Sequence, residues 1–185
     1  MNLPNKLTVL RIIIIPFFIF FLMTSFIPFG KWVAFALFII ASLTDFFDGL
    51  IARKKNLITD FGKFADPLAD KLLVCSALIC LLALGSLGKF GYILVLVIIG
   101  RDFIISGFRL VAAGKGVVIA ADMSGKIKTT LQMIMILFII ADLSFLAIPT
   151  LILEIAVLVL TIVSLIICIV KNRKVLAEKD KGTNE

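Results

Sequence analysis

Six apolar stretches, each long enough to cross a bilayer as a helix, constrain the fold of this chain more than any other feature. A membrane helix needs about 20 mostly apolar residues. The stretches cover residues 7–27, 32–53, 66–86, 90–112, 124–146 and 149–170. Because 62% of the 185 residues are hydrophobic, against roughly half in a soluble domain, the sequence predicts an all-α polytopic membrane protein with six transmembrane helices.

Lysine and arginine gather on one side of these predicted helices. They lie before the first stretch, in the connections after the second and fourth stretches, and in the tail, whereas the opposite side has only Lys31 and Lys89. Cytoplasmic loops of membrane proteins are rich in these residues, so we expect both termini to be cytoplasmic, in the cell (inner or plasma) membrane. This topology, with attraction to anionic membrane lipids, accounts for the net charge of +7 without a nucleic-acid partner.

The chain is expected to form one membrane domain over residues 1–170, followed by a charged cytoplasmic tail over residues 171–185. The segment from Asn2 to Arg11 is polar on one side and apolar on the other. Such a segment is typical of a short helix that lies in the membrane interface, so we predict an N-terminal interfacial helix. Glycine and proline predict the connections between helices, namely Pro28, Gly30, Gly85, Gly88 and Pro149.

Four aspartates lie within 26 positions at the ends of the second and third stretches. Asp45 and Asp48 are three residues apart, and Asp66 and Asp70 are four apart, so a helix places each pair on one face. An ionisable group costs roughly 3 kcal/mol near the centre of a membrane span, and such residues usually line a cavity with a function. The alternative is that the acids are surface groups paired with nearby Lys and Arg.

Carboxylates held this close together repel one another, and divalent cations relieve that repulsion. Ligands made only of oxygen suit Mg²⁺ or Mn²⁺. Two metal ions bridged by carboxylates recur in enzymes that act on phosphate groups. The four aspartates therefore predict a two-metal site at one membrane surface, and the small residues Gly49 and Ala52 leave room for a phosphate or a base beside the helix.

The spacing of these residues also resembles a family signature. It runs Asp45, two residues, Asp48-Gly49, two residues, Ala52-Arg53, eight residues, Gly62, three residues, Asp66, three residues, Asp70. Every fixed position resembles the signature of the CDP-alcohol phosphatidyltransferase family. The resemblance implies six transmembrane helices with cytoplasmic termini, an active site facing the cytoplasm, and a homodimer.

The resemblance also implies a role for each matching residue. Asp45, Asp48 and Asp66 correspond to metal ligands, and Asp70 to the base that deprotonates the acceptor hydroxyl while contacting the second metal. The residues that correspond to the binding site of the CDP-lipid are Asn5, Thr8, Arg11, Asp48, Gly49, Ala52, Arg53, Thr59 and Gly62.

A second basic set narrows the choice of acceptor. Arg101 lies well inside an apolar stretch, and a cation buried near the active face requires an anion, which a phosphorylated acceptor would supply. Residues 101–109 and 125–133 resemble those of bacterial family members that use CDP-diacylglycerol and sn-glycerol 3-phosphate, although Asp102 stands where they usually have Glu. We therefore expect Arg101, Arg109 and Lys126 to bind the acceptor phosphate. A helix points Lys126 and Lys128 to different sides, and Lys128 is expected to face lipid headgroups.

The predicted reaction is transfer of the phosphatidyl group from CDP-diacylglycerol to sn-glycerol 3-phosphate, giving phosphatidylglycerol phosphate and CMP. A sister transferase acting on inositol phosphate, serine or another phosphatidyl acceptor is the alternative within the family. A cation transporter is the alternative from a different class, because carboxylates in membrane spans also fit ion pathways. It does not explain the spacing of Gly49, Ala52 and Arg53, nor the position of the acids at one surface.

Overall fold

The computed structural model describes the backbone of residues 3–55, 60–114 and 123–172, and the side chains of residues 6–44, 68–114 and 123–172. Within these ranges the chain forms α-helices, one short 3-10 helix and no β-strand. The elements are α1 (Leu3–Met23), α2 (Gly30–Lys55), α3 (Asp60–Ala83), α4 (Gly91–Gly114), α5 (Met123–Ala141), η1 (Ser144–Leu146) and α6 (Ala147–Lys171). The prediction of an all-α fold is confirmed for this part of the chain.

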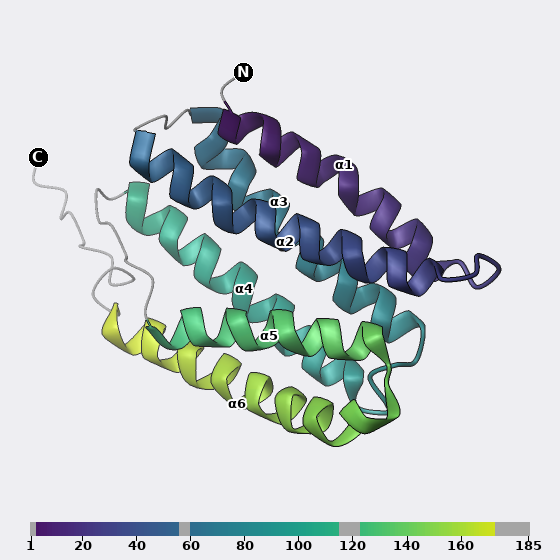
Figure 1. Cartoon of the computed structure of the whole chain (residues 1–185). Coiled ribbons are helices and arrows are strands. Elements are labelled where there is room, and N and C mark those ends of the chain that lie inside the picture. The colour runs from purple at the N-terminus through teal and green to yellow at the C-terminus, as the bar shows by residue number, and fades with distance from the viewer. Residues whose placement is uncertain (1–2, 56–59, 115–122, 173–185) are drawn as a thin grey trace, which may run out of the picture.

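The helices form a bundle in which successive helices run in opposite directions (Figure 1). α1 packs against α2 and α3, and α6 packs against α4 and α5. The end of α2, the start of α3, the end of α4 and the start of α5 therefore lie at one end of the bundle, with the N-terminus. We call this the site end. The far end holds the α3–α4 and α5–α6 connections.

The apolar surface of the bundle is that of a membrane protein. Three described helical segments are long and apolar enough to cross a bilayer: Lys6–Met23 in α1, Met123–Ala141 in α5, and Ser144–Lys171 in η1 and α6. Large apolar side chains such as Phe17 and Ile166 point outward and are more than half exposed. Soluble monomers rarely expose apolar patches of this extent, so lipid is the solvent that suits this surface.

Aromatic rings and small residues pack the interior. Phe18 on α1 and Phe38 on α2 are fully buried, with ring centroids 5.7 Å apart. Ala34, Ala41 and Ala77 are also fully buried. Small residues let membrane helices approach closely, and here they bring α2 and α3 against α1, which sets the positions of the two helices that carry the aspartates.

Two local features differ from the sequence prediction. The segment from Asn2 to Arg11 does not begin with a separate interfacial helix in the described residues, because α1 runs unbroken from Leu3 to Met23. Pro149 was expected in a connection but lies in the first turn of α6. Proline is tolerated in a first turn, where the missing N–H has no partner inside the helix.

The turn after α3 follows the predicted glycines. The Gly85 amide donates to the Leu82 carbonyl and the Ser86 amide to the Leu81 carbonyl, both at 3.0 Å. Gly85 has φ 72°, a left-handed conformation that glycine adopts without strain. Together these form a Schellman motif that ends the helix and turns the chain toward α4.

Candidate functional site

The four predicted aspartates lie on helices that meet at the site end. Asp45 and Asp48 are on the last part of α2, and Asp66 and Asp70 are in the first half of α3. The helical backbone places each pair on one face, as predicted. The side chains of Asp45, Asp48 and Asp66 lie outside the described residues, so the convergence of the four carboxylates stays a prediction.

The side chains of most of the predicted CDP-lipid residues also lie outside the described residues. Thr59 lies outside the described residues altogether. The backbone is helical at the other positions whose side chains are not described, namely Asn5, Gly49, Ala52, Arg53 and Gly62. Among the described side chains there is no group of three or more His, Cys, Asp or Glu that could hold a metal ion.

Thr8 and Arg11 are the two predicted CDP-lipid residues whose side chains are described. Both are buried, with exposed fractions of 0% and 1%. The Arg11 Nε donates a hydrogen bond to the carbonyl oxygen of Ala41 at 3.3 Å. Ala41 lies one helical turn before Asp45, so this contact holds the guanidinium of α1 beside the part of α2 that carries the first aspartate.

A cavity of about 210 Å³ joins the predicted base to part of the predicted phosphate site. It is lined by Asp70 of α3, by Arg101 and Arg109 of α4, and by polar groups that include Lys71, Ser106, Thr129 and Gln132. Pockets for drug-sized ligands measure roughly 300–1,000 Å³, so this one suits a smaller polar molecule. The structure thus brings together residues separated by some 30 to 60 positions in the sequence.

Arg101 is held on two sides. Its Nη1 donates to Asp102 Oδ1 at 2.9 Å, and its Nε donates to Ser164 Oγ on α6 at 3.1 Å. The Ser164 hydroxyl in turn donates to the Thr161 carbonyl at 3.1 Å. Because both bonds come from one planar guanidinium, they fix its orientation at the wall of the cavity.

Lys128 completes this network from α5. Its Nζ donates to Asp102 Oδ1 at 2.9 Å and to Oδ2 at 3.0 Å, and the residue is only 1% exposed. The expectation that Lys128 faces lipid headgroups is therefore wrong. Lys126 is the exposed residue of the two and does not line the cavity. The prediction from helical spacing that the two lysines face different sides is confirmed, and the contact of Lys126 with the acceptor phosphate stays a prediction.

Gln132 is a polar residue of the cavity that was not predicted from the sequence as part of the site. It is 2% exposed, and its buried Oε1 has no hydrogen-bond partner among the residues that the structure describes. A buried acceptor left without a partner costs roughly 1–3 kcal/mol, which a bound donor would recover. The signal was present in the sequence, because Gln132 interrupts an apolar run between Leu131 and Met133.

Comparison with known proteins decides the family. The sequence model of the CDP-alcohol phosphatidyltransferase family matches residues 1–170. The chain belongs to this family. This CDP-alcohol phosphatidyltransferase is 49% identical over 144 residues to the CDP-diacylglycerol--glycerol-3-phosphate 3-phosphatidyltransferase of Bacillus subtilis (strain 168). The aligned region covers 72% of this chain and 73% of the relative.

Other relatives of this CDP-alcohol phosphatidyltransferase agree. It is 45% identical over 133 residues to the protein of the same name from Rickettsia bellii (strain RML369-C), covering 71% of each chain. It is 40% identical over 148 residues to the probable phosphatidylglycerophosphate synthase of Mycobacterium tuberculosis (strain ATCC 25618 / H37Rv), covering 77% of this chain and 68% of the relative. The family resemblance drawn from the aspartate spacing is therefore confirmed.

Proposed function

We propose that this protein transfers the phosphatidyl group of CDP-diacylglycerol to sn-glycerol 3-phosphate, releasing CMP and phosphatidylglycerol phosphate. The relatives named for this reaction support it. The observation in the structure that carries it is the small cavity in which Asp70 faces the same space as Arg101 and Arg109. A base beside two cations, of which Arg101 is held in place by Asp102 and Ser164, suits a small alcohol that carries its own phosphate.

The acceptor half of the mechanism uses the described cavity. Arg101 and Arg109 bind the acceptor phosphate, and Asp70 takes the proton of the attacking hydroxyl. The hydroxyl oxygen then bonds to the phosphorus of the phosphatidyl group as the bond from that phosphorus to CMP breaks. Gln132 Oε1 accepts a hydrogen bond from the other hydroxyl of the acceptor. Lys126, exposed on α5 and outside the lining of this cavity, is proposed as a further contact to the acceptor phosphate.

The donor half of the mechanism lies on α1, α2 and α3. Arg11, buried against α2, lies beside the helix whose residues Asp48, Gly49, Ala52 and Arg53 bind the cytidine diphosphate. Asn5, Thr8, Thr59 and Gly62 complete this site. The small residues leave space for the nucleotide, and the Arg53 guanidinium offers a planar pair of donors to phosphate oxygens.

The four aspartates fit a pair of divalent cations. Asp45, Asp48, Asp66 and Asp70 offer oxygen ligands on two neighbouring helices, which suits Mg²⁺ or Mn²⁺. When bound, the ions neutralise the diphosphate and stabilise the departing CMP. Without them, four carboxylates at one place would repel each other and the anionic donor.

We further propose that all six helices span the cell membrane, with both termini and the site end in the cytoplasm. The Lys and Arg distribution supports this orientation. It places residues 1–170 in the membrane domain and residues 171–185 in a cytoplasmic tail. A homodimer is proposed on the family resemblance alone.

The test is CMP release by the purified full chain in detergent. CDP-diacylglycerol is supplied with sn-glycerol 3-phosphate, inositol phosphate or serine, each with Mg²⁺, with Mn²⁺ or with EDTA. We expect release only with a metal, and fastest with sn-glycerol 3-phosphate. A preference for inositol phosphate would establish the sister activity. No metal-dependent CMP with any acceptor would overturn the transferase proposal.

A further inference from the structure

A cavity of about 550 Å³ lies at the far end of the bundle, away from the site described above. Its walls come from the α3–α4 connection, the end of α5, η1 and the start of α6. The polar groups that line it are the hydroxyls of Ser86, Ser144 and Thr150 and the charged groups of Lys89, Asp142 and Glu154. None of these residues takes part in the proposed transfer reaction.

Glu154 is the unexpected residue of this cavity. From Ala147 to Val170, α6 carries no other charged residue. At 1.5 Å per residue, Glu154 lies about 10 Å along the helix from its start, at a depth where an ionised group is costly. It is half-buried, and none of the described residues hydrogen-bonds or ion-pairs with it.

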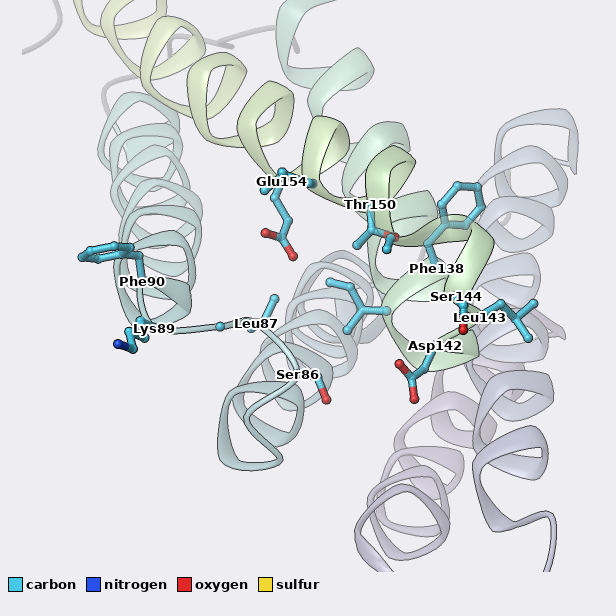
Figure 2. A pocket seen from close by; sticks show the side chains of 14 residues that line it. Ser86, Leu87, Lys89, Phe90, Phe138, Asp142, Leu143, Ser144, Thr150 and Glu154 are labelled. Atoms are coloured by element: carbon cyan, nitrogen blue, oxygen red, sulfur yellow. The ribbon is translucent and has the colours of Figure 1, made fainter.

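The cations around the cavity do not neutralise Glu154. Lys31 Nζ is bound to the Asp142 carboxylate at 2.8 Å. Figure 2 shows Lys89 pointing away from Glu154, whose carboxylate points into the space between α6 and the α3–α4 connection. A carboxylate directed into a cavity without a counterion favours a cationic ligand, because ion pairing offsets its desolvation.

An apolar groove continues from this cavity along the bundle. It measures about 240 Å³, runs between α4 and α6, and shares Leu87, Phe90, Leu151 and Glu154 with the first cavity. The rest of its lining is almost entirely apolar, with Ile93, Leu94, Ile155 and Leu158. A cavity lined by polar and apolar groups thus continues into a hydrophobic groove between α4 and α6.

We propose that the far-end cavity and this groove bind a phospholipid whose headgroup carries a primary ammonium. The ammonium donates to the Glu154 carboxylate, and one acyl chain lies in the groove between α4 and α6. An anionic headgroup would be repelled by Glu154, and a quaternary ammonium has no N–H to donate. A soluble amine would fill the far-end cavity but leave the groove without an occupant. This inference does not depend on which acceptor the site end uses.

Native mass spectrometry of the full chain tests the ammonium contact. The protein is titrated with lipids of identical acyl chains that carry ethanolamine, choline or glycerol headgroups. We expect the ethanolamine lipid to bind about fivefold more tightly than the others, as for a partly exposed ion pair. The preference disappears in Glu154→Gln and persists in Asp142→Asn, a matched control in the same cavity. No preference in the wild type, or the same preference in Glu154→Gln, overturns the proposal.

A pair of tryptophan variants tests the groove. Ile155 and Ile152 are both more than half exposed on α6, but only Ile155 lines the groove. We expect Ile155→Trp to weaken binding of the ethanolamine lipid and Ile152→Trp to leave it unchanged. Equal effects contradict the acyl-chain position. If Glu154→Gln loses the mass of the dimer while its lipid preference is unchanged, Glu154 contacts the other subunit and does not bind lipid. That result also overturns the proposal. CMP release, followed in parallel, is expected to stay at the wild-type rate in Glu154→Gln whether or not the lipid proposal holds.

Discussion

Asp102 accepts hydrogen bonds from two cations, Arg101 on its own helix and Lys128 on the next. One carboxylate therefore keeps two positive side chains in place beside the cavity. Lys128 stays buried on the inner side of this network, while Arg101 lines the cavity. Groups proposed to contact substrate, such as Asp70 and Arg101, are thus distinct from groups that position them, such as Asp102 and Lys128.

The proposed base, Asp70, gives a first prediction, on activity. Asp70→Asn removes the group that accepts the proton of the attacking hydroxyl, and a general base contributes roughly 10²–10⁴-fold to rate. We expect binding of CDP-diacylglycerol to persist and CMP release to fall by at least the lower figure. Asp142→Asn, at the far end, serves as the control with wild-type activity. Wild-type turnover in Asp70→Asn would exclude Asp70 as the base.

Lys128 gives a second prediction, on stability. Breaking a buried ion pair from one side costs roughly 3–5 kcal/mol, and this is an upper bound for Lys128→Met because Arg101 still faces Asp102. We expect a lower melting temperature in detergent and a higher KM for the acceptor. The exposed Lys126→Met variant is expected to melt like the wild type. Equal melting temperatures for the two variants would contradict the buried position of Lys128.

A double variant checks that the ion pair causes the loss. Asp102→Asn alone leaves the buried Lys128 ammonium without a counterion and lowers stability, and adding Lys128→Met removes that unpaired charge, because removing both partners of a buried polar pair costs less than removing one. The double variant should therefore recover part of the lost stability. It should not recover the KM, because Arg101 still lacks its charged anchor.

Gln132 gives a third prediction, in which stability and activity move in opposite directions. Gln132→Leu removes a buried oxygen without a partner, so the melting temperature is expected to stay the same or rise. The acceptor loses a hydrogen bond, and we expect its KM to rise about tenfold, equivalent to ~1.4 kcal/mol. Thr130→Val, on the exposed side of α5, is the control. An unchanged KM in Gln132→Leu would remove Gln132 from the acceptor site.

At the scale of elements, helix positions depend on small residues at the contacts. Ala77 of α3 is fully buried, whereas Ala83 near the end of the same helix is exposed. We expect Ala77→Leu to cost roughly 1–3 kcal/mol by overpacking and Ala83→Leu to have little effect. Thermal unfolding of the two variants in one detergent measures the difference. Equal unfolding temperatures would show that the packing around Ala77 can relax.

The helix boundaries and the side chains between helices differ in how well they could be predicted from the sequence. The length of the apolar stretches predicted the helices, and Gly85 predicted the end of α3, because both depend on local chemistry. The start of α6 was placed too late, since Pro149 is equally compatible with a connection and with a first helical turn. The inward position of Lys128 could not be predicted, because it depends on Asp102, a partner on another helix. The place of Gln132 in the cavity could not be predicted for the same reason, because it depends on residues of other helices.

At the scale of the whole molecule, orientation is the testable property. In a chain whose native cysteines are replaced, Phe26→Cys reports on the far end and Lys171→Cys on the site end. A membrane-impermeant maleimide added to intact cells is expected to label the first variant only, and the second after permeabilisation. The reverse pattern would place the site end outside the cytoplasm.

The network around Arg101 also has a consequence for biogenesis. The partners of the Arg101–Asp102 pair come 26 and 63 positions away, at Lys128 and Ser164. At a synthesis rate of about 5–20 residues per second, α4 leaves the ribosome several seconds before Ser164. During that interval α4 enters the bilayer with a charged pair that its final neighbours do not yet shield. The last helix therefore completes the environment of a charged residue made much earlier, and a chain truncated before α6 should be recognised as unfinished and degraded.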